Sequence, residues 1–114
     1  MKTYTIVLAA GVYDDLSQIW NYFRDELSSP ETAEELFDAF ESAILSLRTL
    51  PARYPRAESK STRKIVLRRM IVKNFFIYYY VDETRASVNI VAIIYTRRDQ
   101  IPRLNEIFDG RMTN

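Results

Sequence analysis

Three short runs of apolar and aromatic residues, separated by turn sequences, dominate the second half of the chain. They are Ile65–Val72, Phe75–Val81 and Val88–Tyr95. The segments between them, Lys73-Asn74 and Asp82–Ala86, have the lengths of hairpin turns. This pattern predicts three consecutive strands that form an antiparallel meander.

Two sets of side chains alternate along the middle run. Successive side chains of a strand point to opposite faces of a sheet, so the two sets lie on different faces. One set is Phe75, Ile77, Tyr79 and Val81, and the other is Phe76, Tyr78 and Tyr80. One set can cover a core, and the other is either covered by another element or available for binding.

The first half of the chain changes from a strand pattern to a helical one. Thr3–Leu8 alternates and predicts a strand. Two helical faces follow, broken at Ser28-Ser29-Pro30-Glu31, where Ser29 is predicted to cap the second helix and Pro30 to start it. The first face is Val12, Leu16, Ile19, Trp20, Phe23 and Leu27, and the second is Ala33, Leu36, Phe37, Phe40, Ile44 and Leu47. Helices joined by so few residues predict an antiparallel helical hairpin.

The remaining segments complete the predicted fold. Pro51–Lys64 reads as a long basic surface loop, and a short helix is expected at about Leu104–Phe108. The element order is then β-α-α-β-β-β-(α), an α+β fold in which the helical hairpin packs on one face of a small, mainly antiparallel four-stranded sheet. The 114 residues, 47% of them hydrophobic, predict a single domain over 1–114.

Composition excludes several classes of function. The chain has no cysteine and no histidine, which rules out Ser-His-Asp and Cys-His catalysis and most zinc, haem and iron–sulfur sites. Asp14, Asp15, Glu31, Glu34 and Glu35 are interpreted as solvated surface rather than a metal site, so we expect neither a metal nor a cofactor. No apolar run approaches the roughly 20 residues that span a bilayer, and we expect a cytoplasmic protein.

Charge is distributed unevenly although the net charge is only +1. Residues 1–50 carry three basic and nine acidic groups, whereas residues 51–114 carry thirteen basic and six acidic groups. The basic half suits a polyanion or the acidic face of a protein partner. It could equally neutralise the acidic helices beside it, and both interpretations remain open.

Four groups of residues occur in the order and spacing of a known family pattern. They are Ala10, Asp15-Leu16, Ile19-Trp20 and Tyr22; Ser29-Pro30, Ala33, Ile44, Leu47 and Leu50-Pro51; Arg69-Met70 with Phe75–Val81; and Ile90–Ile94 with Arg97-Arg98-Asp99. Through them the chain resembles toxins of the RelE/ParE superfamily, the toxic partners of type II toxin–antitoxin modules, over nearly its whole length. RelE-like toxins cleave mRNA in the ribosomal A site, and ParE-like toxins poison DNA gyrase.

The ribonuclease arm of the superfamily needs basic residues on the open sheet face and near the C-terminus. RNA cleavage requires a group that activates the ribose 2′-OH, cations for the phosphate and a proton for the leaving oxygen. By resemblance, Arg69 and Arg98 stand at phosphate-binding positions. Phe76, however, replaces the arginine of the central strand, and the expected tyrosine falls near Leu104. The resemblance is therefore closer to the ParE-like arm.

Proton transfer is the second difficulty for a ribonuclease without histidine. The candidates are Tyr95, Tyr78, Tyr80, Lys73 or a carboxylate, and unperturbed tyrosine and lysine titrate near pH 10. If the chain cleaves RNA, the predicted catalytic residues are Arg69, Arg98, Tyr95 and Lys73. If the chain does not cleave RNA, the sequence assigns no catalytic residue, and we do not expect an enzyme.

The predicted surface for a target or an antitoxin combines cations with aromatic residues. Its members are Arg68, Arg69, Lys73, Phe76, Tyr78, Tyr80, Arg97 and Arg98. The three aromatic residues could form the floor under a partner, could be covered by the C-terminal tail, or could stack on bases at about 1–3 kcal/mol per base.

The resemblance implies a growth-inhibiting toxin that forms a hetero-oligomer with a cognate antitoxin and acts on DNA gyrase. The alternative activity is ribosome-dependent cleavage of mRNA. A third possibility is a non-toxic nucleic-acid- or protein-binding module of the same fold.

Overall fold

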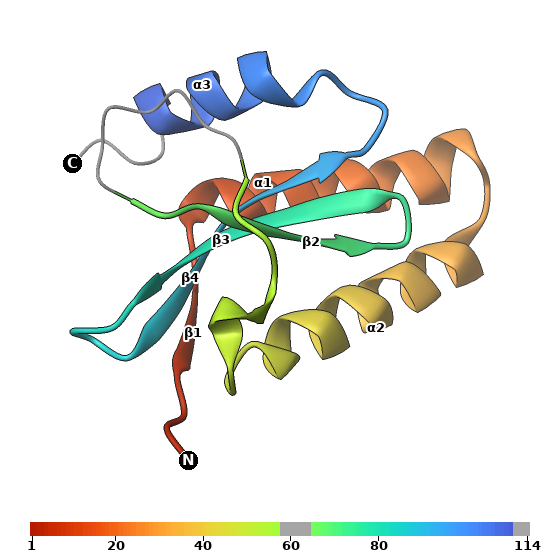
Figure 1. Ribbon diagram of the computed structural model, residues 1–114. Coiled ribbons are helices and arrows are strands. Elements are labelled where there is room, and N and C mark those ends of the chain that lie inside the picture. Colours follow the sequence, from red (N-terminus) through yellow and green to blue (C-terminus); the bar gives the residue numbers. More distant parts are fainter. Residues whose placement is uncertain (58–64, 111–114) are drawn as a thin grey trace.

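The computed structural model describes residues 1–57 and 65–110 (Figure 1). Its elements follow one another as β1 (Thr5–Leu8), α1 (Ala10–Asn21), a π-helical turn (Tyr22–Glu26), α2 (Pro30–Ser46), a 3-10 turn (Pro51–Arg53), β2 (Arg68–Val72), β3 (Phe75–Asp82), β4 (Ser87–Tyr95) and α3 (Gln100–Gly110). This order confirms the predicted β-α-α-β-β-β-(α) fold. The last helix starts four residues earlier than expected, at Gln100 rather than Leu104.

The four strands form one mixed sheet in the order β1-β4-β3-β2. β2, β3 and β4 make the expected antiparallel meander, and β1 joins it in parallel beside β4. The β3–β4 ladder shifts register between Tyr78, which pairs with Ala92, and Tyr79, which pairs with Ile90. Val91 is therefore the extra residue of a β-bulge, which increases the local twist.

The main core lies between the sheet and the helical hairpin. The strand set that contains Phe75, Ile77 and Tyr79 faces α1 and α2, as the alternation requires. The fully or nearly buried residues of this main core are Val12, Leu36, Phe40, Ile44, Leu47, Met70, Phe75, Ile77, Tyr79, Val88, Ile90 and Ile93. In Figure 1, α2 lies below the sheet and α3 lies above it.

A second, smaller core lies on the opposite face of the sheet, beneath α3. It contains Leu67, Tyr78, Val91, Ala92, Ile94 and Leu104, with Phe76 and Tyr80 partly buried at its edge. Helix α3 therefore lies over Tyr78, while Phe76 and Tyr80 stay partly exposed. Covering by the tail, one of the three possibilities open from the sequence, holds for part of this aromatic set.

The ends of the two long helices differ from the sequence prediction. Ser29 does not cap the backbone of α2, and its hydroxyl donates instead to Oγ1 of Thr32 at 2.6 Å. Past α1, the N–H of Leu27 donates to the carbonyl of Tyr22, a π-type i→i+5 bond that widens the last turn. Leu27, expected on the buried face, is consequently 49% exposed.

Residues 51–57 of the predicted basic loop lie in the described part of the chain. Pro51 is buried, and the Arg53 guanidinium donates to the carbonyl of Thr49 at 2.7 Å. Residues 55–57 run along the free edge of β2, where the N–H of Ala57 donates to Leu67 and the N–H of Arg69 donates to Pro55. The rest of the predicted loop, residues 58–64, lies outside the described part of the chain.

Tyr79 links the sheet to the 3-10 turn and makes the stability of the protein sensitive to alkaline pH. Its buried hydroxyl donates to the carbonyl of Pro51 at 2.6 Å, and burial raises the pKa of Tyr79 to about 12. Because the unfolded pKa is near 10, the stabilisation is complete below pH 10 and is lost as the pH rises toward 12.

We therefore expect urea unfolding midpoints to fall between pH 9 and pH 11. Tyr79→Phe should lower the free energy of unfolding by about 1 kcal/mol at pH 9 and should make the fall with pH shallower. Some fall remains, because burial also raises the pKa of Tyr78. Equal pH dependence in the two proteins would contradict this role for Tyr79.

Candidate functional site

Three cations meet at one corner of the sheet, which we call the cationic corner: Lys73, Arg97 and Arg98. Lys73 lies in the β2–β3 turn with φ 56°, and Arg97 and Arg98 lie in the loop between β4 and α3. The turn and the loop are joined, because the N–H of Thr96 donates to the carbonyl of Asn74 at 2.9 Å. These three of the eight residues predicted for the binding surface therefore lie on segments that the fold holds together.

The charges of the cationic corner are uncompensated within the described part of the chain. All three side chains are exposed, and none of them forms an ion pair with a described residue. Arg85 and Lys2, by contrast, have a carboxylate nearby: Arg85 lies 4.0 Å from Asp82, and Lys2 lies 3.0 Å from Glu83. The corner therefore presents positive charge at the surface of the protein.

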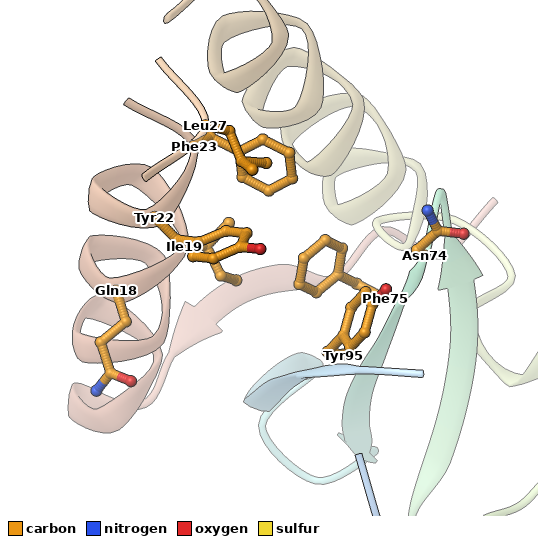
Figure 2. A pocket seen from close by; sticks show the side chains of 8 residues that line it. All are labelled: Gln18, Ile19, Tyr22, Phe23, Leu27, Asn74, Phe75 and Tyr95. Atoms are coloured by element: carbon orange, nitrogen blue, oxygen red, sulfur yellow. The ribbon is translucent and has the colours of Figure 1, made fainter. Parts of the chain in front are cut away.

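An apolar groove of about 510 Å³ opens beside the cationic corner (Figure 2). Its walls come from α1 and the π-helical turn on one side and from the ends of β3 and β4 on the other. It is lined by Gln18, Ile19, Tyr22, Phe23, Leu27, Asn74, Phe75 and Tyr95. In Figure 2, the rings of Phe75 and Tyr95 on the sheet side face the apolar side chains of the helix side. Asn74 follows Lys73 in the β2–β3 turn, and Tyr95 precedes the loop that carries Arg97 and Arg98, so the groove lies next to the corner.

The remaining predicted residues lie elsewhere. Arg68 points to the α2 face and donates to the carbonyl of Tyr54 at 2.8 Å. Arg69 points to the opposite face, where its guanidinium carbon lies 4.2 Å from the centroid of the Phe76 ring, in a cation–π contact. Phe76 thus pairs with a cation of its own sheet. Tyr80 is partly buried beside the second core.

Tyr78 is fully buried, which removes it from the predicted binding surface. Its hydroxyl donates to Oε1 of Gln100 at 2.8 Å. Burial raises the pKa of Tyr78, while the hydrogen bond and positive charge of Arg69 act in the opposite direction. A raised pKa keeps the phenol protonated at neutral pH, the wrong direction for a general base.

The four residues predicted for RNA cleavage are divided between the two faces of the sheet. Tyr95 pairs with Phe75 on the helix-hairpin face, with ring centroids 5.6 Å apart, whereas Arg69 lies on the α3 face. Arg98 and Lys73 belong to the cationic corner. Sequence reasoning could not separate them, because Arg69 and Tyr95 come from different strands whose register is a tertiary property.

Asp15 and Gln100 were missed by sequence reasoning. Asp15 was expected on a solvated surface in the first turn of a helix, but α1 begins at Ala10 and Asp15 is buried in its second turn. It accepts a hydrogen bond from the N–H of Ile93 at 3.1 Å and lies 3.6 Å from Arg103 of α3. The sequence did contain a sign of this burial, because Asp15 lies three residues after Val12 and therefore on the apolar face of the helix. Gln100 gave no such signal.

The described residues contain no group of three or more histidine, cysteine, aspartate or glutamate side chains that could hold a metal ion. Among the described helices, none combines the length and the apolar character required to cross a membrane.

Comparison with known proteins places the chain in a family. Residues 6–100 match the family model described as the ParE toxin of the type II toxin–antitoxin system parDE. No curated protein sequence matches the chain.

Two solved structures share the fold. One, from the chromosomal ParDE toxin–antitoxin system of P. aeruginosa, has 15% identity and a TM-score of 0.65 and covers 85% of this chain and 100% of its own. The other, from the archaeal RelE-RelB complex of Pyrococcus horikoshii OT3, has 17% identity and a TM-score of 0.53 and covers 85% of this chain and 99% of its own. With a family match over residues 6–100, the chain belongs to the ParE toxin family of type II toxin–antitoxin systems.

Proposed function

We propose that this ParE-family toxin acts in the cytoplasm by inhibiting DNA gyrase and that a cognate antitoxin neutralises it by binding the groove and the cationic corner. The observation that carries the proposal is the division of the candidate catalytic residues between two faces. Tyr95 and Arg69 have the sheet between them. On the Arg69 face the phenol of Tyr78 is buried and hydrogen-bonded, and Tyr80 is partly buried beside the second core. This arrangement supports action by contact rather than by a base, an acid and cations gathered at one phosphate.

The cationic corner suits the surfaces that gyrase offers. Gyrase works on DNA, so a toxin bound to it meets either phosphates or the acidic protein surface that faces them. Exposed guanidinium groups bind phosphate and carboxylate oxygens through two parallel hydrogen bonds, and Arg97 and Arg98 are exposed and form no ion pair with a described residue. The adjoining groove would add apolar contact area.

The test uses purified toxin with gyrase and, in parallel, with ribosomes that carry mRNA. The proposal expects loss of supercoiling activity and accumulation of cleaved DNA held by gyrase, with ribosome-bound mRNA intact. Cleavage of that mRNA without any effect on gyrase would overturn it and would establish the ribonuclease alternative. Inactivity in both assays, together with harmless expression in cells, would leave only a binding module of this fold.

The antitoxin is expected to dock an amphipathic helical segment in the groove and to place acidic residues against the cationic corner. The groove lies next to three cations that form no ion pair with a described residue, and it exposes the large side chains of Tyr22, Leu27 and Tyr95 to solvent. This charge and apolar pattern selects an acidic partner segment.

Leu27→Asp should weaken antitoxin binding about tenfold or more, because it places a carboxylate in an apolar groove beside acidic residues of the partner. Titration calorimetry with the cognate antitoxin measures the change in Kd. The matched control is Leu50→Asp, because Leu50 is 67% exposed and its φ of 48° is one that aspartate tolerates. Leu50 lies beyond the far end of α2, so its variant should bind normally. Equal affinity of both variants would place the antitoxin elsewhere.

A further inference from the structure

Gln100, the first residue of α3, connects three parts of the structure through one side-chain amide. Its Nε2 donates to the carbonyl of Tyr95 at 2.8 Å and to the carbonyl of Arg98 at 2.6 Å. Its Oε1 accepts a hydrogen bond from the hydroxyl of Tyr78 at 2.8 Å. One amide thus joins the end of β4, the loop that carries the cations and the middle of β3.

Tyr78 is the rigid end of this connection. Its ring is fully buried in the second core, and its backbone pairs with Arg69 on one side and Ala92 on the other. Such a ring cannot move without opening the packing between the sheet and Leu104. Burial also keeps its hydroxyl protonated and therefore able to donate. The position of the Gln100 amide is set by the sheet rather than by the loop.

The loop itself has little else to hold it. Arg97 and Arg98 are exposed, carry like charges on consecutive residues and have no ion-pair partner among the described side chains. Within the described part of the chain, the backbone of residues 96–98 otherwise forms the bond of the Thr96 N–H to Asn74 and that of the Arg98 N–H to Tyr95 at 3.0 Å. The Gln100 bonds close the loop at the Arg98 carbonyl, the end that neither of these backbone bonds reaches.

We propose that Gln100 is a positioning residue that preorganises the Arg97–Arg98 loop for its target, with Tyr78 as the anchor. The target contact rests on the proposed inhibition of gyrase, whereas the ordering of the loop is independent of it. Preorganisation increases affinity because the loop loses less conformational freedom on binding. The free energy that orders the loop comes from the buried packing around Tyr78 in the sheet, which neither arginine contributes to.

Two variants remove different sets of the hydrogen bonds that Gln100 forms. Gln100→Ala removes all three, and Gln100→Glu keeps an acceptor for Tyr78 but cannot donate to Tyr95 or Arg98. Amide hydrogen exchange, followed by NMR, should show the Arg98 N–H exchanging about tenfold faster in both variants. The core amide of Ile77 should keep its protection, which shows that the fold is intact.

Gyrase inhibition gives the functional measurement. Both variants should require about tenfold more protein for half-inhibition. In an Arg97→Ala/Arg98→Ala background, adding Gln100→Ala should cause little further loss, because the contacts that the ordered loop positions are already removed. A purely structural role would instead give additive losses.

The outcomes separate the two proposals. Unchanged protection of the Arg98 N–H in Gln100→Ala overturns the positioning role, whatever the target. Normal gyrase inhibition by a Gln100→Ala protein with an opened loop overturns the functional part of the inference alone. A wild-type protein without effect on gyrase overturns the proposed function, and the exchange measurement still decides whether Gln100 orders the loop.

Discussion

The double variant Arg97→Ala/Arg98→Ala is expected to lose about 100-fold or more of its potency against gyrase while it keeps its fold, if each cation makes one charge-assisted contact that contributes about tenfold. Both side chains are exposed and make no ion pair with described residues, so their removal costs the folded protein little. The measurement is the concentration that half-inhibits supercoiling, together with thermal unfolding of the same preparations.

The matched control is Arg85→Ala. Arg85 is also exposed, and its substitution removes one positive charge where the double variant removes two, but it lies in the β3–β4 turn at the opposite end of β3 and β4. Its variant should inhibit gyrase like the wild type. Raising the salt concentration should weaken wild-type inhibition more than that of the double variant, because exposed charge contacts are screened. Full potency of a well-folded double variant would remove the cationic corner from the proposed mechanism.

Asp15→Ala is expected to have the largest effect on stability, about 2–4 kcal/mol, which corresponds to a fall in Tm of about 10 °C. The substitution leaves the buried N–H of Ile93 without the carboxylate that accepts its hydrogen bond. It also removes the carboxylate that faces Arg103, whose guanidinium then keeps, among the described carboxylates, Glu106 at 2.9 Å. Helix α3 loses one of its attachments to the rest of the fold.

Thermal and urea unfolding check this expectation against two comparison variants. Asp14→Ala removes the neighbouring carboxylate, which is exposed, and should change the free energy of unfolding by less than about 0.5 kcal/mol. Asp15→Asn keeps an acceptor for the Ile93 N–H and should fall between the two. An Asp15→Ala protein that unfolds within about 2 °C of the wild type would show that this contact contributes little to the fold.

The element order and the helix-hairpin core were predictable because their signals are local. The alternation in β3 assigns Phe75, Ile77 and Tyr79 to one face of the sheet. Helical spacing assigns Leu36, Phe40 and Ile44 to the apolar face of α2, and burying both apolar faces requires that they pack on each other. The cationic corner was also predictable in part. Lys73 and Arg97 lie in turns at strand ends, and an antiparallel meander brings the turn after β2 next to the end of β4.

The groove and the covering helix could not be predicted in the same way. The groove depends on the widened turn after α1, which exposes Leu27 where a regular helix would bury it. The covering of Tyr78 depends on α3, a short helix with few apolar residues. Three of its residues contact parts of the chain that are distant in sequence: Leu104 lies in the second core, Arg103 faces Asp15, and Gln100 accepts a hydrogen bond from Tyr78. The periodicity of apolar residues in the sequence does not indicate contacts of this kind.

The alternating aromatic pattern between residues 65 and 99 by itself determined that the chain builds an antiparallel meander with one face under a helical hairpin. Only the tertiary structure decided the use of the other face. There Phe76 pairs with Arg69, Tyr78 anchors Gln100, and the exposed cations lie at the corner instead of on the sheet. The physical reason is that strand periodicity follows from backbone geometry, whereas the partner of a face depends on residues brought together from distant parts of the chain.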